Sequence, residues 1–297
     1  MIKRDIAVVL PCYGQAHFLA DAVGSLRAQT LPPAEIVVVD DGSPDDVRAA
    51  VAGFPEVRVV RQENRGLSGA RNRGLAETTS PFVHFLDADD TLRPQALLTL
   101  RSWMTAHPEA AFAWGFNQPY HDDGRPVGWG ATSFDGVPGY AALLEKNVVG
   151  APVGVLFRRE PLDAVGGFAE DLGACEDWDL YLRLARSYPI GCVGVVLADY
   201  RHHGSNMSRQ HALLYASARE VLNRQERWVG DRPEWEAALG RGRRDVEMRH
   251  GFPTGVDHLR SLIDDGRWAD AAVQGVRLMV RFPGAVIDEV VDRHRSR

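Results

Sequence analysis

Clustered aspartates stand at two points of the sequence where short apolar segments end. Asp40 and Asp41 follow one such segment, and Asp87, Asp89 and Asp90 follow another. Carboxylates crowded in one cleft repel one another unless a cation or a donor-rich ligand neutralises them. Their hard oxygens suit Mg²⁺ or Mn²⁺, which bind substrate phosphates. Zinc is not expected, because the sequence has no cluster of cysteines and histidines. A single aspartate after a strand is commonly a turn residue or a helix cap, so the prediction of a metal and diphosphate site needs both clusters.

The elements that must position these carboxylates alternate between strand and helix patterns. We predict strands at 6–10, 36–39, 57–60 and 82–86, and helices at 17–29 and 68–78. Ser43 or Asp45 is expected to cap the helix after the second strand. Such alternation favours a mostly parallel sheet with helices on both faces, whose loops after the strands open on one edge. We therefore expect both acidic clusters on that edge.

The loop after the first strand excludes two common nucleotide-binding motifs. Residues 11–17 read PCYGQAH, which contains neither the glycine fingerprint of dinucleotide-binding proteins nor a Walker A lysine loop. A bound phosphate would therefore be held by a metal and side chains instead of a glycine-rich cradle.

The rest of the chain changes character twice. We predict a helix to about residue 107, a strand at 110–116, a long loop at 117–139, a strand at 153–157, and helices at 160–165 and 177–187. From about residue 212 the sequence shows only helical periodicity, with turns expected at Gly230, Gly251 and Gly266. The last of these turns would join a helical hairpin used for packing or dimerisation.

Composition narrows the class of protein. With 297 residues, 45% hydrophobic and 25% charged, and a net charge of -6, the chain is a globular protein without the basic surface of a nucleic-acid binder. Its three cysteines have no CxxC spacing, which fits a reducing compartment, so we expect a cytoplasmic protein. No apolar segment approaches the ~18 residues of a membrane span. Any membrane contact would be peripheral, at the inner face.

Six motifs together resemble the family-2 inverting glycosyltransferases of the GT-A fold, within the nucleotide-diphospho-sugar transferase superfamily. They are LPCY at 10–13, VVVDDGS at 37–43, NRG at 64–66 with GARN at 69–72, FLDADD at 85–90, GGF at 166–168, and EDWDL at 176–180 with Arg183. The resemblance covers roughly residues 4–208. It implies a GT-A domain at 1–210, with a nucleotide-binding half at 1–116 and an acceptor and catalytic half at 117–210, followed by a helical extension at 211–297.

The resemblance also implies a donor site. Asp41 would accept a hydrogen bond from the nucleotide base, and Arg71 would lie near the donor nucleotide and its phosphates. Pro11, Tyr13 and Ala88 would line the same site. Asp87 and Asp89 would form the DXD motif. Asp89 would coordinate Mn²⁺ or Mg²⁺ directly, and Asp87 would lie nearer the ribose or a metal-bound water.

The catalytic base is implied to lie in the Glu176–Asp177 pair. Inverting transfer is a single in-line displacement, so one carboxylate must face the leaving diphosphate and take the proton of the acceptor hydroxyl. We assign this role to Asp177, with Glu176 as the alternative. His203 matches a histidine that lies close to the diphosphate and metal in the family. Asp179 is expected to be a first-turn helix acid.

The predicted function is metal-dependent, inverting transfer of a hexosyl or related sugar from a nucleotide diphosphate-sugar, UDP favoured, to a hydroxyl acceptor. The acceptor, a glycan, a lipid-linked sugar or a small molecule, would meet residues 114–160 and the loop before Glu176. A homodimer through the helical tail stays open. The segment 83–91 also matches the signature of haloacid-dehalogenase-type phosphatases. That phosphatase and a catalytically silent nucleotide-sugar-binding protein are the alternatives.

Overall fold

The computed structural model divides into two compact units, which are described one at a time. It describes residues 3–121, 124–127, 134, 136, 138–204, 206–207, 210–283 and 285. The first unit comprises Met1–Leu143, Asn147–Leu172 and Glu176–Asn206, and the second comprises Leu144–Lys146, Gly173–Cys175 and Met207–Arg297. The finer domain limits at 1–116, 117–210 and 211–297 stay a prediction.

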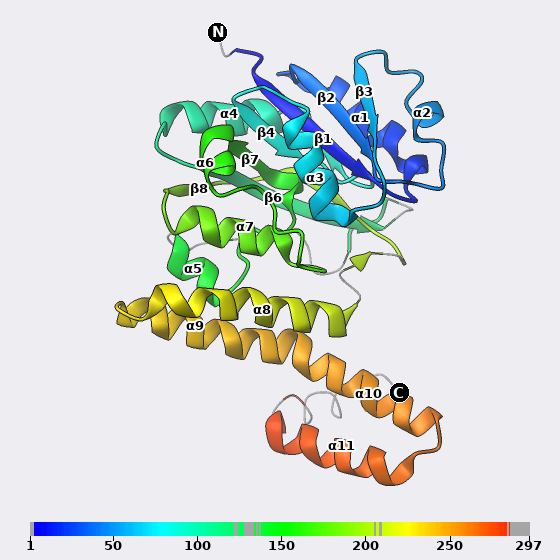
Figure 1. Cartoon of the computed structure of the whole chain (residues 1–297), viewed down its shortest axis with the longest axis vertical. Helices are drawn as coiled ribbons and strands as arrows, with labels where there is room; N and C mark the ends of the chain where they lie inside the picture. Colours follow the sequence, from blue (N-terminus) through cyan, green and yellow to red (C-terminus); the bar gives the residue numbers. More distant parts are fainter. Residues whose placement is uncertain are drawn as a thin grey trace. The chain divides into compact units, whose positions relative to one another are not determined.

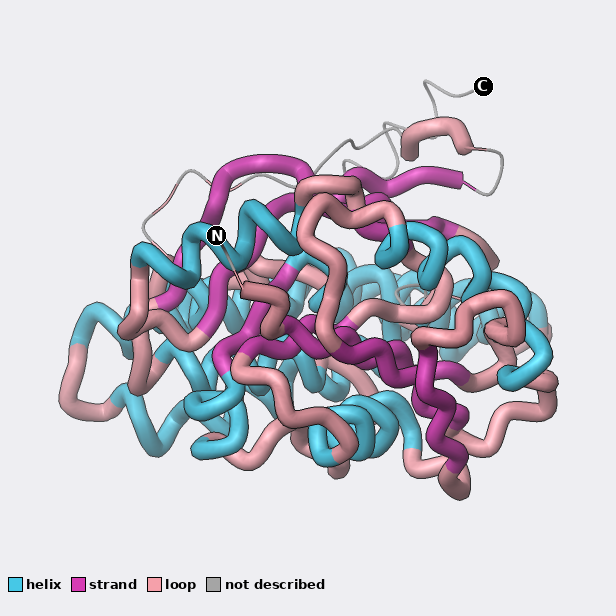
Figure 2. The backbone as a smooth tube through the Cα atoms, turned by 90° about the horizontal axis from the view of Figure 1, so that it is seen from above, coloured by secondary structure: helices cyan, strands magenta, loops and turns pink. Residues whose placement is uncertain are grey.

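A single mixed sheet forms the centre of the first unit (Figures 1 and 2). Its strand order is β3-β2-β1-β4-β7-β6-β8-β5, with β1 parallel to both β2 and β4. The strands are β1 (Ile6–Cys12), β2 (Glu35–Asp40), β3 (Val57–Arg61), β4 (Phe82–Phe85), β5 (Thr91–Leu92), β6 (Phe112–His121), β7 (Val155–Arg158) and β8 (Ile190–His202). Strands β7 and β5 run antiparallel to their neighbours, so the sheet is less uniformly parallel than the alternation predicted.

Helices cover both faces of this sheet because alternate residues of its strands are apolar on both sides. Val8 and Leu10 of β1 belong to a core shared with α1 and α4. Val9 points to the other face, where a Cβ added at Gly74 of α3 would come within 2.1 Å of the valine side chain. A fully buried strand of this kind is typical of a sheet with helices on both sides.

The helices of the first unit lie close to the predicted ranges. They are η1 (Ala16–Phe18), α1 (Leu19–Arg27), α2 (Val47–Ala50), α3 (Gly66–Ala76), α4 (Ala96–Ala106), α5 (Tyr140–Glu145), η2 (Pro152–Gly154), α6 (Arg159–Ala164) and α7 (Glu176–Ala185). The α5 range extends two residues into the second unit. The predicted cap of α2 is wrong, because Asp46 accepts the hydrogen bond from the Ala49 amide.

The predicted loop at 117–139 begins too early. Strand β6 continues to His121 because it pairs with the long strand β8 along residues 117–121. Of the remaining loop, residues 122–123, 128–133, 135 and 137 lie outside the described part of the chain. The acceptor-binding role predicted for residues 114–160 therefore rests on sequence there.

The second unit is helical, as predicted. Its helices are α8 (His211–Val229), α9 (Pro233–Val246), the π-helical turn η4 (Glu247–Gly251), α10 (Phe252–Asp264) and α11 (Trp268–Arg281). The turn predicted at Gly251 is wrong, because η4 leads directly from α9 into α10. The turn at Gly266 is confirmed, with a left-handed φ of 69° between α10 and α11. None of the described helices is long and apolar enough to cross a membrane.

Candidate active site

The two acidic clusters follow neighbouring parallel strands. Strand β2 ends at Asp40 and pairs with β1, which pairs on its other side with β4, just before Asp87. Because carboxyl ends of parallel strands meet at one edge of a sheet, the clusters open on the same side of the first unit. Between them, Pro11 is buried in β1, whereas Tyr13 is 55% exposed in the loop that follows.

Asp40 and Asp41 have different partners. Asp40 accepts hydrogen bonds from the Ser43 amide at 2.9 Å and from Nη1 of Arg61 at 2.6 Å, so it shapes the turn after β2. Asp41 is buried, and its Oδ1 accepts from Nε2 of Gln62 at 2.7 Å and from the Arg65 amide at 2.9 Å. These bonds orient the Asp41 carboxylate before any ligand arrives.

The turn after β2 also holds the loop after β1. Ser43 Oγ accepts from the Gly14 amide, and Asp45 Oδ2 accepts from the Ala16 amide, each at 3.0 Å. The two residues that the sequence offered as helix caps therefore fasten the loop that contains Tyr13.

Arg71 of α3 links the acidic cluster after β4 to the carboxylate pair at the start of α7. It is 1% exposed, its Nη2 donates to Oδ1 of Asp87 at 2.7 Å, and its Nη1 donates to Oε1 of Glu176 at 2.5 Å. The ring of Phe168 lies 5.2 Å from its guanidinium carbon. Burial lowers the pKa of Arg71, but the charges of Asp87 and Glu176 outweigh this and raise it above its usual value. The sequence predicts Arg71 near the donor phosphates, whereas in the structure its two terminal nitrogens bind the carboxylates of Asp87 and Glu176.

Asp89 shares one oxygen between two neighbours. Its Oδ2 accepts from Nε2 of Gln15 at 2.9 Å and lies 2.9 Å from Nε2 of His203. Burial and the charge of Asp87 raise the pKa of Asp89. Sequence reasoning missed Gln15, since a lone glutamine in a loop carries no signal of this contact.

Asp90, which follows Asp89 in the sequence, is fully buried. Its Oδ1 accepts from the Arg201 amide at 2.9 Å, and its Oδ2 has no hydrogen-bond partner among the described residues. Burial and the charge of Asp89 raise the pKa of Asp90 well above its usual value. Ala88, between the DXD aspartates, is also buried.

The side chains of this region include possible ligands for a divalent cation, but they do not form a complete metal site. Within the described ranges, no three histidine, cysteine, aspartate or glutamate side chains are grouped to hold a metal ion. Asp89 and His203 are adjacent, and the oxygen of the Asp89 carboxylate is the type of ligand that suits Mn²⁺ or Mg²⁺. Asp87 is only partly exposed and gives one oxygen to Arg71. The arrangement therefore offers Asp89 and His203 to a metal before Asp87.

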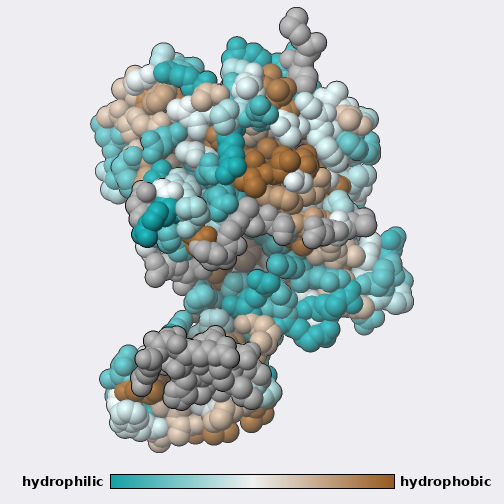
Figure 3. Space-filling model, turned by 180° about the vertical axis from the view of Figure 1, so that it is seen from behind, coloured by the Kyte–Doolittle hydropathy of each residue, from teal (hydrophilic) through white to brown (hydrophobic). Residues whose placement is uncertain are grey.

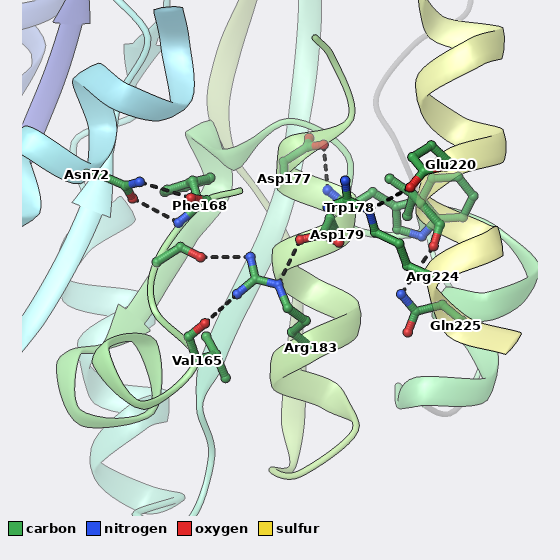
Figure 4. Close-up of polar contacts among 12 residues, drawn as sticks. Asn72, Val165, Phe168, Asp177, Trp178, Asp179, Arg183, Glu220, Arg224 and Gln225 are labelled. Atoms are coloured by element: carbon green, nitrogen blue, oxygen red, sulfur yellow. Dashed lines mark hydrogen bonds and ion pairs between the residues drawn. The ribbon is translucent and has the colours of Figure 1, made fainter. Parts of the chain in front are cut away.

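The second carboxylate pair begins helix α7, and its two members differ in their surroundings. Glu176 is buried against Arg71. Asp177 is partly exposed, accepts a hydrogen bond from the Trp178 amide at 2.6 Å (Figure 4), and has no ion pair with a described residue. Burial and the neighbouring Glu176 charge raise the pKa of Asp177 to about 7. The two members therefore differ in that Glu176 is paired with Arg71, whereas Asp177 faces no cation of its own among the described residues.

Arg183 fastens the start of α7 to the segment before it (Figure 4). Its Nε donates to Asp179 at 2.7 Å, and its other nitrogens donate to the carbonyls of Val165 at 2.8 Å and Gly167 at 2.7 Å. Asp179 therefore has a structural role, as an ion-paired acid in the first turn of α7.

The same segment is held from its other side by α3. The Asn72 side chain donates to the Phe168 carbonyl at 2.9 Å and accepts from the Phe168 amide at 2.8 Å (Figure 4). Gly167 lies between these contacts with a φ of 68°, and a Cβ there would come within 2.6 Å of Asn72 Oδ1. The GARN and GGF motifs, almost a hundred residues apart in the sequence, are therefore in direct contact in the structure.

Residues 7–166 match the family model described as Glycosyl transferase family 2. The chain belongs to this family. The succinoglycan biosynthesis protein ExoU of Rhizobium meliloti is 31% identical over 314 residues, which cover 98% of this chain and 89% of ExoU. The alignments with some other curated relatives span 30% of those proteins. The match includes 83–91, so the alternative of a haloacid-dehalogenase-type phosphatase is wrong.

Solved structures confirm the predicted GT-A type α/β fold with C-terminal helices. The mannosyltransferase PcManGT from Pyrobaculum calidifontis has a TM-score of 0.63 at 18% identity, covering 94% of this chain and 81% of its own. Residues 1–349 of TarS from S. aureus give a TM-score of 0.58 at 20% identity, covering 93% and 91%. At such identities the likeness supports the fold alone. Membership of family 2 makes the protein a glycosyltransferase.

Proposed function

We propose that the protein transfers a sugar from a nucleotide diphosphate-sugar to a hydroxyl acceptor, with metal assistance and inversion at the anomeric carbon. The structure of TarS was determined with UDP-GlcNAc, and that of PcManGT with GDP-Man and Mn²⁺. These complexes support a nucleotide-sugar donor and a divalent metal. Because the two neighbours hold different nucleotides, UDP, which the sequence analysis favours, and GDP are both tested.

The observation that carries this proposal is the contrast between Glu176 and Asp177. The Glu176 carboxylate is neutralised by Arg71, whereas the pKa of Asp177 is raised to about 7. A general base works best when its pKa lies near the operating pH, because it is then ionised and still basic enough to take a proton. Asp177 would remove the acceptor proton as the hydroxyl oxygen attacks the anomeric carbon and the nucleoside diphosphate leaves.

The donor would bind along the edge formed by β1, β2 and β4. Asp41, held by Gln62 and Arg65, would accept a hydrogen bond from the base, with Pro11 and Tyr13 beside it. Asp89 and His203 would hold Mn²⁺ or Mg²⁺, and Asp87 would approach it with the oxygen that Arg71 does not use. When bound, the metal would offset the charge that develops on the departing diphosphate. Arg71 would act on the donor through Asp87.

The acceptor is proposed to be a growing glycan. ExoU, with its alignment over 98% of this chain, is named as a succinoglycan biosynthesis protein, which supports a role in polysaccharide assembly. A lipid-linked sugar presents the same hydroxyl chemistry, so acceptor assays include both.

The test pairs Asp177→Asn with Glu176→Gln in the full chain. Binding of UDP and GDP, each with and without Mn²⁺, is measured by titration calorimetry, and transfer is measured with radiolabelled UDP- and GDP-sugars. We expect Asp177→Asn to bind nucleotide like the wild type but to lose transfer by about 10³-fold or more. Glu176→Gln is expected to keep part of the activity, since it disturbs Arg71 without removing the base.

Two results would contradict the proposal. Transfer by Asp177→Asn at wild-type rates would exclude it as the base. Nucleotide binding by the wild type without transfer to any sugar or to water would favour the catalytically silent binding protein. The anomeric configuration of the product, read by NMR, tests inversion separately.

A further inference from the structure

Helix α11 is apolar on two opposite faces. On one face, Ala271, Leu278 and Phe282, just after the helix, are buried at 5–6% exposure. A Cβ added at Gly255 of α10 would come within 2.5 Å of the Leu278 side chain, so the two helices are in close contact. The Phe282 ring also meets Phe252 edge to face, with ring centroids 5.5 Å apart. This face accounts for the hairpin.

The other face of α11 is exposed. Val273, Val276, Met279 and Val280 are 53%, 55%, 53% and 78% exposed. Their spacing of three and four residues places them in one stripe, which we call the outer face of α11. Hydrophobic surface, brown in Figure 3, is visible along the outer edge of the hairpin at the bottom of that view. A contiguous exposed apolar stripe of this kind is typical of an interaction site.

Charges beside the outer face indicate what covers it. Asp270 lies in the first turn of α11, and Arg277 and Arg281 lie in its last two turns. They are seven and eleven residues from Asp270, so all three flank the stripe on the same side. Arg277 has no ion pair with any residue in the described part of the chain. Arg281 is already paired with Glu247, and Asp270 has an exposed ion pair with Arg267 at 2.8 Å. An antiparallel helix with the same sequence would bring its own Asp270 to Arg277, and the exposed pair with Arg267 is weak enough to be shared.

We propose that the outer face of α11 joins two copies of this chain, with α11 of each copy packed antiparallel against the other. The two-fold axis lies between Val273 and Gln274, so the outer face of each copy also packs against the exposed Trp268 and Ala272 at the start of the other copy's α11. On the same flank, Asp270 then lies beside Arg277 of the partner subunit, and the symmetry makes this contact twice. A two-fold interface needs such a self-complementary patch.

The size of the patch sets the strength of this association. Four apolar side chains and two exposed ion pairs fall well short of the roughly 800 Å² per partner that stable interfaces bury. The dimer is therefore expected to dissociate in the micromolar range, and its population depends on protein concentration.

Sedimentation equilibrium of the full chain, from about 1 to about 200 µM, tests the proposal. Val280→Glu should leave the protein monomeric throughout, because it buries a charge at the contact. Val195→Glu is the matched control, since Val195 is also an exposed valine, at 47%, but lies in β8 of the first unit. It should associate like the wild type. Circular dichroism and transferase activity check that both variants are folded.

The charge pairing gives a second, independent measurement. Asp270→Arg should weaken the dimer about 3- to 10-fold, and the double variant Asp270→Arg/Arg277→Asp should restore it, because the reversed pair is again complementary. Failure of the double variant to recover would overturn the antiparallel arrangement.

Three other results would overturn the second copy as the occupant. The first is a wild-type monomer at every concentration. The second is wild-type binding to phosphatidylglycerol vesicles, lost in Val280→Glu, without self-association, which would make the face a lipid contact. The third is dimerisation only after removal of residues 286–297, which would show that the chain's own end covers the face.

Discussion

Replacing the proposed catalytic base should make the protein more stable at neutral pH. The pKa of Asp177 is raised from the usual 3.8 to about 7, so the folded protein holds this proton more tightly than the unfolded chain does. As pH rises from about 4 to about 7, the unfolded chain releases the proton first, and the free energy of unfolding falls. Asp177→Asn cannot titrate and escapes this loss.

The magnitude follows from the same values. Each ten-fold difference in proton affinity is worth ~1.4 kcal/mol, so the shift corresponds to about 4 kcal/mol above pH 7. Because the Asp177 side chain is partly exposed and water screens its charge, we expect Asp177→Asn to gain about 2–4 kcal/mol at pH 8. The gain should vanish near pH 4. The asparagine oxygen can still accept the Trp178 amide hydrogen bond, so little else changes.

Urea denaturation followed by tryptophan fluorescence, at several pH values from about 4.5 to 8, measures this difference. Asp179→Asn is the matched control, since Asp179 is two residues away but ion-paired with Arg183. It should lose about 2–3 kcal/mol at pH 8, the opposite sign, because the buried Asp179 carboxylate loses its charge-assisted bond with Arg183. A stability difference between Asp177→Asn and the wild type that does not grow with pH would refute the reasoning that Asp177 is held protonated by its surroundings.

Further predictions concern the rate, the backbone and the metal. The wild-type kcat/KM should rise through about pH 7 as Asp177 ionises and then level off; a flat profile in initial-rate measurements would argue against this base. Gly167→Ala should lower the stability by about 1–3 kcal/mol, because φ is positive and its Cβ would meet Asn72; an unchanged melting temperature contradicts this. EDTA should weaken UDP or GDP binding about 10-fold or more in calorimetry, with little effect left in Asp89→Asn. Equal EDTA sensitivity in both proteins would place the metal elsewhere.

Much of the fold could be predicted because local patterns determine it. Four strands of the first 90 residues were placed within two residues at each end, since β-branched segments bounded by Gly, Pro and Asp are unambiguous. The two-residue strand β5 was missed, because nothing in Thr91–Leu92 distinguishes it from a loop. The extension of β6 was missed for another reason: residues 117–121 read NQPYH and include a proline, and pairing with β8 overrides their weak local preference for a strand.

The candidate site divides in the same way. Motif spacing placed Asp41, Asp87, Asp89 and Asp177 at strand and helix ends, which local patterns locate. The partner of Arg71 could not be predicted, since Glu176 is 105 residues away and the chain has 40 acidic residues to choose from. The pairing of Glu176, but not Asp177, with Arg71 is that long-range contact, so only the structure shows the difference on which the proposed base rests.

The hydrogen bonds that hold residues 165–168 limit where this enzyme can be redesigned. The side chain of Asn72 in α3 and that of Arg183 in α7 both hydrogen-bond to backbone atoms of this segment. Lysine at 183 could not reach three acceptors from one planar group. Libraries that seek new acceptor specificity should leave Asn72 and Arg183 fixed. A change at either position would shift the start of α7, which carries the proposed base Asp177, together with the loop that was meant to vary.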